Sequence, residues 1–171
     1  MRRSIEARIH LDFCAEVYNL QLRGGRHFLH EHPAGATSWK EASVQLLASH
    51  PRVGTTIGDM CAYGLTTSSP DGECQIPVLK PTRWLSSSPA LLKRLSQRCR
   101  HDHRHGHLQG RTRTQLSAIY TRRLCKEIIK GIHDQRMQEV GPLQKMLDIA
   151  ERERERDAPS IVLTGVRSVT V

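Results

Sequence analysis

Segments with helical periodicity alternate with short β-prone segments along the first 97 residues, and this alternation constrains the fold more than any other feature of the sequence. Residues 5–22 carry apolar side chains at three- and four-residue steps, and Ile9, Phe13 and Leu20 fall on one helical face. Further helices are expected over 37–48, 90–97 and 115–132, strands over 26–31, 53–60 and 83–85, and loops over 66–77 and 99–114. This order predicts an α/β layer structure in which helices cover a mainly parallel sheet.

The predicted sheet is small for a nucleotide-binding domain. A complete sheet of that kind has about six strands and begins with a glycine-rich turn between strand and helix. The chain has neither a G-x-G-x-x-G motif nor a P-loop. We therefore expect an incomplete, Rossmann-like sheet of about three strands flanked by helices over residues 1–135. Residues 136–171 are expected to add a polar helix with alternating Glu and Arg over 151–156, and a tail.

The charge balance favours a polyanionic partner. The chain of 171 residues has 26 Lys and Arg against 17 Asp and Glu, a formal charge of +9. Between residues 98 and 130 there are nine Lys or Arg and two Asp or Glu, a difference of +7 that accounts for most of the excess. Such a concentration predicts nucleic-acid binding, and we expect DNA more than RNA.

Two further patterns bear on the compartment. No run approaches the roughly 18 apolar residues that a membrane span requires. The five cysteines are an odd number, widely scattered, without a C-x-x-C pair, which suits reduced thiols better than a disulfide framework. We expect an intracellular protein of the nucleus or cytoplasm that does not bind membranes.

Two motifs place candidate site residues at predicted strands. Glu31 stands between His30 and His32 at the end of a strand, where α/β folds place their active crevices. Glu31 can instead cap the next turn or pair with a flanking histidine. A metal site formed by Glu31 with both histidines is disfavoured, because neighbouring strand residues point to opposite faces. Lys80 and Arg83 form the second motif, in which Arg83 is expected to hold a phosphate or a base edge. The alternative is that Arg83 only stacks on the adjacent indole of Trp84.

The polar segment 99–114 offers a third set of candidates. Its arginines, with Arg104, Arg111 and Arg113 as the nucleic-acid contacts, predict a basic loop, and a plain solvated loop is the alternative. The segment also supplies ligands for zinc, although spacing at every second residue departs from the C-x-x-C and H-x-x-x-H patterns of closed zinc sites. The expected metal set is therefore none, and the alternative set is Cys99, His103, His105 and His107.

The order of motifs over residues 12–132 resembles the C-terminal half of a cytosine-5 DNA methyltransferase domain, and most closely the methyltransferase-like segment of retrotransposon-type polyproteins. The resemblance is carried by Glu31-His32-Pro33 before Ser38-Trp39, and by Cys61-x-Tyr63-Gly64 before Lys80-Pro81-Thr82-Arg83. It implies that Glu31 is the carboxylate that holds the target cytosine and that Arg83 lies in the base pocket. It also implies that Ser117 and Ala118 lie beside the cofactor, S-adenosylmethionine.

The departures from the family are equally informative. His32-Pro33 replaces the Asn-Val that follows the family's Glu, and no cysteine of the chain occupies the place of the family's nucleophile. The family's cofactor loop lies upstream of the region that this chain represents. The resemblance thus predicts a truncated module of mobile-element origin, without methyl transfer of its own unless an N-terminal half is supplied. The alternative is a small basic nucleic-acid-binding protein that uses the His/Cys/Arg-rich loop, with zinc.

Overall fold

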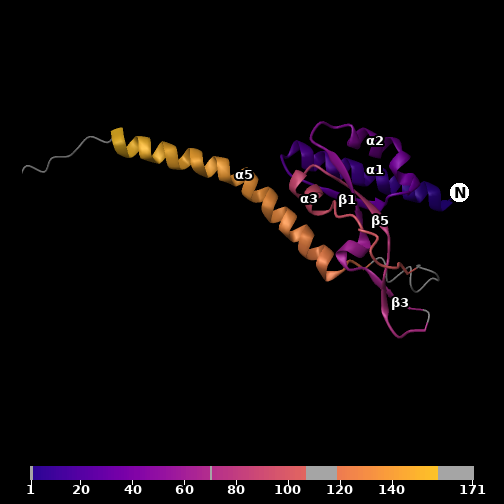
Figure 1. The fold of residues 1–171 in the computed structure, drawn as a ribbon. Coiled ribbons are helices and arrows are strands. Elements are labelled where there is room, and N and C mark those ends of the chain that lie inside the picture. Colours follow the sequence, from indigo (N-terminus) through magenta and orange to yellow (C-terminus); the bar gives the residue numbers. More distant parts are fainter. Residues whose placement is uncertain (1, 70, 107–118, 158–171) are drawn as a thin grey trace, which may run out of the picture. The chain divides into compact units, whose positions relative to one another are not determined.

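The computed structural model describes residues 2–69, 71–106 and 119–157 (Figure 1). It divides into two compact units, Met1–Arg136 and Met137–Val171. The elements are α1 (Arg2–Arg23), β1 (Leu29–Pro33), η1 (Thr37–Lys40), α2 (Ala42–Ala48), β2 (Gly54–Asp59), η2 (Met60–Tyr63), β3 (Thr66–Ser68), β4 (Gln75–Pro77), β5 (Pro81–Ser86), α3 (Pro89–Arg94) and α5 (Arg122–Asp157).

The main sheet has three strands in the order β1-β5-β2, and both outer strands run antiparallel to β5. The mixed α/β class is confirmed, but the expected mainly parallel sheet is wrong. The crossover through α2 does place β1 and β2 in the same direction, yet β5 inserts between them. The chain from β2 to β5 contains the short turn η2 and the β3–β4 hairpin in place of a crossover helix, and parallel neighbours require such a crossover.

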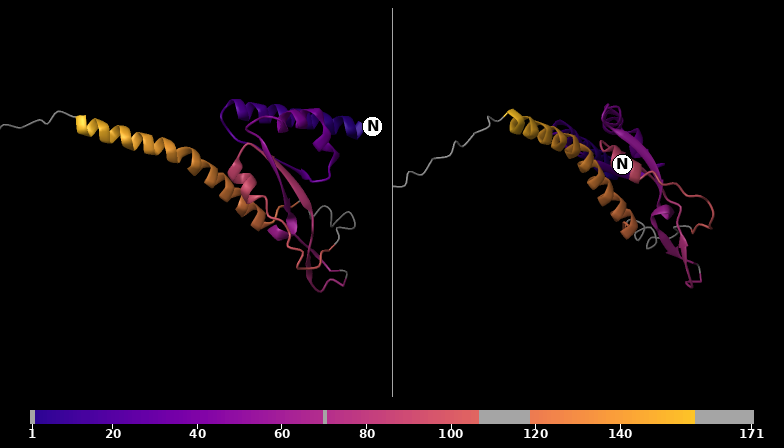
Figure 2. Two further views of the ribbon diagram at one scale, coloured as in Figure 1. Left: turned by 45° about the horizontal axis from the view of Figure 1, so that its top comes forward. Right: turned by 60° about the vertical axis from the view of Figure 1, so that its left-hand side comes forward.

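Each face of the sheet packs on its own core, because successive strand residues point to opposite faces. Trp84 of β5 belongs to one core and Leu85 to the other. The Trp84 core includes residues of η2, α3 and the first turn of α5, whereas the Leu85 core is covered by α1 and α2 (Figure 2). Both tryptophans of the chain are buried, Trp84 in the first core and Trp39 in the second. Most of the few aromatic side chains, Phe13 and Tyr120 excepted, therefore pack in or against the two cores.

The face of α1 predicted to be buried is the exposed one. Ile9 and Phe13 are 63% and 61% exposed, whereas Leu11, Ala15 and Leu22 are buried against α2 and the sheet. The helix carries apolar side chains on two faces, so periodicity alone does not identify the face that packs.

Several other boundaries differ from the sequence predictions. The helix expected over 37–48 is divided into η1 and α2, and Glu41, which lies between them, pairs with Arg8 at 3.2 Å. The loop expected over 66–77 contains the β3–β4 hairpin. Helix α5 begins at Arg122 and continues through Pro142, so the polar helix is not separate. No helix in the described part of the chain combines the length and the apolar character needed to cross a bilayer.

Candidate metal centre

A buried aspartate fixes the start of the polar loop 97–106. Asp59, the last residue of β2, is 1% exposed. Its Oδ2 accepts hydrogen bonds from Arg98 Nε and from the Cys99 backbone N–H, both at 2.8 Å, and its own N–H donates to the Gln97 carbonyl at 2.9 Å. A buried carboxylate needs such donors to compensate for its lost hydration. The backbone of Cys99 is thereby held against the end of β2.

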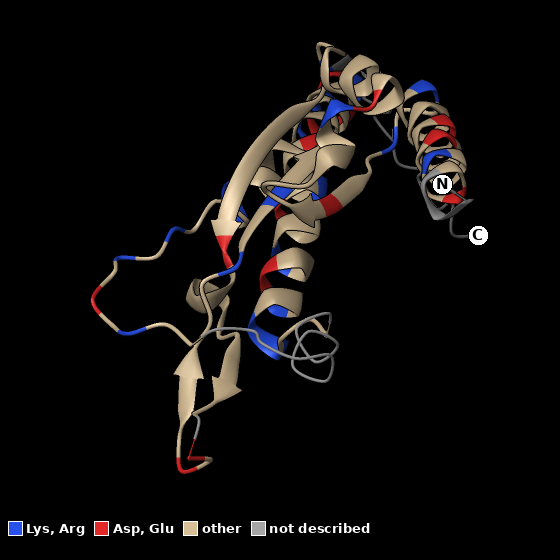
Figure 3. Cartoon of the chain, turned by 90° about the vertical axis from the view of Figure 1, so that its right-hand side faces the viewer, with Lys and Arg blue, Asp and Glu red and all other residues tan. Residues whose placement is uncertain are grey.

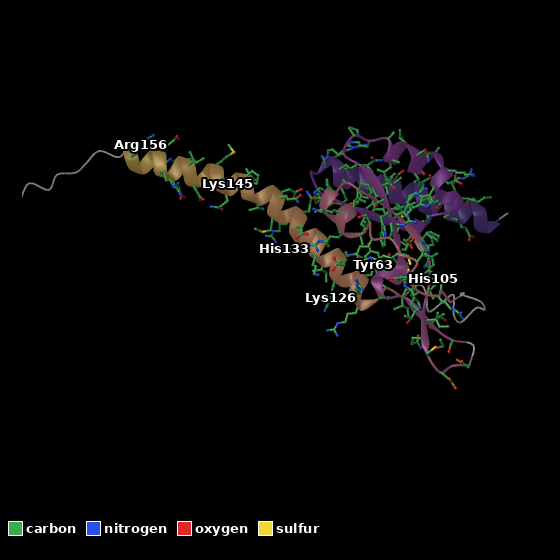
Figure 4. The ribbon with its side chains drawn as sticks, in the orientation of Figure 1. Tyr63, His105, Lys126, His133, Lys145 and Arg156 are labelled. Carbon is green, nitrogen blue, oxygen red and sulfur yellow. The ribbon has the colours of Figure 1, made fainter. Side chains whose placement is uncertain are left out.

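A buried tyrosine and a backbone contact hold the rest of the loop. Tyr63, in η2, donates its hydroxyl proton to the Arg94 carbonyl and accepts the Gln97 N–H, each at 3.0 Å, and burial raises its pKa to about 12. At the far end, the Gly106 N–H donates to the Pro77 carbonyl at 2.8 Å. Figure 4 labels Tyr63 and His105, one from each of the two segments that meet at the site.

The short turn η2 presents a cysteine to this loop. Met60 and Tyr63 are buried in the core, which leaves the half-buried Cys61 between them free to face the loop. Gly64 ends the turn with φ +82°, a left-handed conformation that favours glycine.

Four potential metal ligands converge where η2 and the loop meet: Cys61, Cys99, His103 and His105, whose ligand atoms all lie within 4.8 Å of one another. Cys99 Sγ lies 3.3 Å from His105 Nε2 and 3.7 Å from His103 Nε2. Tetrahedral bonding to zinc, with Zn–S of about 2.3 Å and Zn–N of about 2.0 Å, separates ligand atoms by about 3.3 to 3.8 Å. The two distances from Cys99 Sγ fall in this range, so this set of two thiols and two imidazoles suits zinc.

Neighbouring groups orient the ligands. His103 Nδ1 lies 2.7 Å from Asp102 Oδ1, and this hydrogen bond lowers the pKa of Asp102. Carboxylates bonded to the second nitrogen of a ligating histidine are common around zinc, where they fix the ring. The His101 N–H lies 3.3 Å from Cys99 Sγ, and His101 itself has φ +57°, which turns the chain sharply between Cys99 and His103.

The electrostatic state of the thiols follows from their surroundings. Burial and the adjacent Cys99 raise the pKa of Cys61 to about 11. Without a metal ion, the Cys61 thiol is therefore protonated at neutral pH. A bound cation would displace this proton, as metal binding to thiols generally does.

Basic side chains surround the centre. Arg98 and Arg100 line a hollow of about 520 Å³ beside Cys61, together with Arg123 from the first turn of α5. Arg100, Arg104 and Arg123 are exposed, and none forms a salt bridge within the described residues. Figure 3 shows basic positions along this loop and at the start of α5, with one acidic position on the loop.

The expected metal set was none, and three residues of the alternative set, Cys99, His103 and His105, belong to this cluster. The fourth residue of that set, His107, falls outside the described residues, and Cys61 joins the cluster from η2. Cys61 was missed because it lies far upstream of the loop and has no second cysteine or histidine close to it in sequence; its place directly after a predicted strand was one available signal. The predicted contacts Arg111 and Arg113, and the predicted cofactor residues Ser117 and Ala118, also fall outside the described residues.

The residues of the expected base pocket do not converge. Glu31 is paired in register with Trp84, and its Oε2 accepts a 3.4 Å hydrogen bond from the Tyr120 hydroxyl. Arg83 is paired with His32 on the opposite face of the sheet, where its guanidinium lies 5.1 Å from the centre of the Trp39 ring.

The structure also shows where Arg83, the pair of His30 and His32, and Lys80 lie. The alternative for Arg83, stacking on Trp84, is wrong, because adjacent strand residues face opposite sides and Arg83 reaches Trp39 instead. The rings of His30 and His32 lie 4.8 Å apart on the face opposite Glu31, as alternation predicts. Lys80 precedes β5, and its carbonyl accepts the Met60 N–H at 3.2 Å, so its backbone joins this linker to η2.

Comparison with known proteins gives no relative for this arrangement. No protein-family model, no curated protein and no solved structure matches the chain. The chemistry of the centre therefore has to be inferred from its own ligands and charges.

Proposed function

We propose that the chain is a zinc-dependent nucleic-acid-binding protein in which one zinc ion folds the His/Cys/Arg-rich loop. The observation that carries the proposal is the convergence of two cysteine and two histidine ligand atoms within 4.8 Å. Thiolate and imidazole ligands select zinc over magnesium or calcium, which take oxygen ligands. Four protein ligands close the coordination sphere, whereas a catalytic zinc keeps one position open. The proposed role of the ion is therefore structural, and the proposal assigns no enzymatic activity.

The ion would compensate for the scarcity of apolar residues in this loop. Residues 97–106 contain no regular secondary structure and only Cys99 among apolar types, so hydrophobic burial contributes little to ordering them. A zinc ion bound by Cys61 and by the loop would link η2 to residues 99–105 and supply the missing free energy.

The potential zinc ligands of the loop are spaced at every second residue or at multiples of it, which leaves positions between them for basic side chains. Arginines interleave with the potential ligands along the loop. Arg104 stands between His103 and His105, and it is exposed, as is Arg100 next to Cys99. The same loop would thus bind zinc and present exposed guanidinium groups to phosphates.

Zinc binding is tested by competition with a chromophoric chelator and by metal analysis of the purified chain. We expect one zinc ion per chain, and a large loss of affinity in Cys61→Ser and Cys99→Ser. Cys74→Ser is the matched control, because Cys74 is exposed in the β3–β4 hairpin outside the ligand set. Equal loss in the control variant, or no zinc bound at equimolar metal, would contradict the proposal.

Nucleic-acid binding is tested by fluorescence anisotropy of the zinc-loaded chain with labelled duplex DNA and single-stranded RNA. Arg100→Gln combined with Arg104→Gln should weaken binding and reduce the salt dependence by about two phosphate contacts. Arg152→Gln combined with Arg154→Gln removes the same charge from an exposed part of α5 and serves as the control. If both double variants lose equal affinity, net charge alone explains binding and the loop has no special role.

The methyltransferase-like interpretation, with S-adenosylmethionine as cofactor and a separate N-terminal half as partner, stays a prediction. A base pocket would need Glu31 and Arg83 to meet, and they lie on opposite faces of an antiparallel sheet. Isothermal titration with S-adenosylmethionine, in the presence and absence of cytosine-containing duplex, tests it, with Glu31→Ala as the variant. Binding that depends on Glu31 would favour this interpretation over the zinc-dependent one.

A further inference from the structure

The two thiols of the proposed zinc centre form a close pair of cysteines. Cys61 Sγ and Cys99 Sγ lie within 4.8 Å of each other, and all five cysteines are free thiols. The other three lie in separate elements: Cys14 in α1, Cys74 in the turn between β3 and β4, and Cys125 in α5. Within the described residues, the metal-ligand cluster thus contains one cysteine pair and no third thiol.

Zinc binding and disulfide formation exclude each other at this pair. A zinc ion holds two thiolates about 3.8 Å apart, whereas a disulfide requires about 2.05 Å between the sulfur atoms. Closing that gap requires movement of only one partner, and Cys99 lies in a segment without regular secondary structure. Once both sulfurs share a covalent bond, neither is a thiolate that can hold the metal.

The pair is also accessible. Both Cys61 and Cys99 line the hollow of about 520 Å³ beside the centre, which is large enough to admit a small oxidant. The same hollow is lined by Arg98, Arg100 and Arg123, so its walls are cationic.

We propose that Cys61 and Cys99 are a redox modification site: a hydroperoxide converts them to a disulfide, zinc is released, and the loop loses its affinity for nucleic acid. This inference rests on the proposed function, because it gives the regulation of the same centre. It makes the metal-organised loop sensitive to the oxidation state of the cell.

The reaction balances with hydrogen peroxide as the oxidant. One thiolate sulfur attacks a peroxide oxygen, the O–O bond breaks, and hydroxide leaves, which gives a sulfenic acid. The second thiolate attacks the sulfenic sulfur, the S–O bond breaks, and a second hydroxide leaves as the S–S bond forms. Two protons convert the hydroxides to two waters, so the two sulfurs together lose two electrons and the peroxide gains them. Zinc departs as the divalent cation from the two neutral histidines.

The experiment uses the zinc-loaded full chain and one equivalent of hydrogen peroxide. A chromophoric chelator reads the zinc released, and peptide mass spectrometry without reduction maps the disulfide. We expect one zinc released per chain, a Cys61–Cys99 crosslink, and anisotropy that falls to the level of the chelator-treated chain. Dithiothreitol followed by zinc should restore all three.

A control variant and the zinc content of the chain separate the outcomes. A Cys74→Ser, Cys125→Ser double variant should behave as the wild type, because neither residue belongs to the centre. Zinc retention under peroxide, or a crosslink that involves another cysteine, would overturn the inference while leaving the proposed function intact. A chain that holds no zinc would instead refute the proposed function, and mapping the crosslink in that metal-free chain would still decide whether Cys61 and Cys99 are the pair that oxidises.

Discussion

Asp59→Ala should weaken both the fold and the proposed zinc centre, because one carboxylate oxygen anchors the start of the loop. The bond from the Cys99 N–H to Asp59 Oδ2 is 2.8 Å long, and the carboxylate is 1% exposed. A hydrogen bond to a charged group contributes about 1.5 to 3 kcal/mol, and an unsatisfied buried N–H adds to the loss. The salt bridge to Arg98 adds at most about 1 kcal/mol, since the Arg98 side chain is 57% exposed.

We therefore expect Asp59→Ala to lower the free energy of unfolding by about 3 kcal/mol, measured by urea denaturation in excess chelator. Because Asp59 positions the backbone of a ligand, zinc affinity of the folded chain should fall about 10- to 100-fold. Competition titration at a temperature where the variant is folded measures this second effect.

Arg98→Ala is the matched control. It removes the exposed partner and leaves the buried bond to Cys99 in place, so it should cost about 1 kcal/mol or less. Asp59→Asn retains an oxygen that accepts the Cys99 N–H and should fall between the two. If Asp59→Ala costs no more than Arg98→Ala, or if its zinc affinity is unchanged, the role assigned to Asp59 is wrong.

Three further predictions test the fold. Burial, with a smaller contribution from His32, lowers the pKa of His30 to about 4, so the unfolded chain takes up the proton first as the pH falls. The contribution of neutral His30 to the free energy of unfolding should be complete above about pH 6.5, and the free energy should decrease by about 2 kcal/mol between pH 7 and 5. In His30→Phe the free energy of unfolding should depend less on pH. Equal pH profiles of the two proteins in denaturation experiments would contradict this. Gly58→Ala places a Cβ against the Leu95 carbonyl oxygen and should lower the free energy of unfolding by more than about 2 kcal/mol. In Gly54→Ala the new Cβ meets only a side-chain methyl, so the loss in the same assay should be smaller. Pro142→Ala should strengthen α5 by about 1 to 3 kcal/mol, seen as higher helical circular dichroism and slower amide exchange near residue 142; no change in either would show that the proline costs the helix nothing.

The sequence predicted most elements of the sheet and its helices but not their pairing. Periodicity and turn residues act locally, so they located β2, β5 and the helix that begins after Ser88, whose hydroxyl accepts the Leu91 N–H. Strand order depends on contacts between segments far apart in the chain. Nothing in the local pattern of residues 81–86 indicates that this strand lies between the two earlier ones.

The site shows the same division between local and distant information. Cys99, His103 and His105 belong to one polar segment and were recognisable from it. Cys61 joins them only because η2 and the loop are both tied to the end of β2, through Tyr63 and Asp59. For α1 the difficulty was different, since its two apolar faces are equally regular, and only the presence of α2 decides which one is buried.

The position of β5 in the sheet has a consequence for synthesis of the chain on the ribosome. Among the strands that the structure describes, β1 and β2 both pair with β5 alone, so the main sheet does not form before residues 81–86 have left the exit tunnel. Leu29 of β1 and Gly54 of β2 both pair with Ser86 of β5, so the formation of the sheet is a single late event. A nascent chain halted before Pro81 would carry two unpaired strands, and such strands are targets for chaperones and for aggregation.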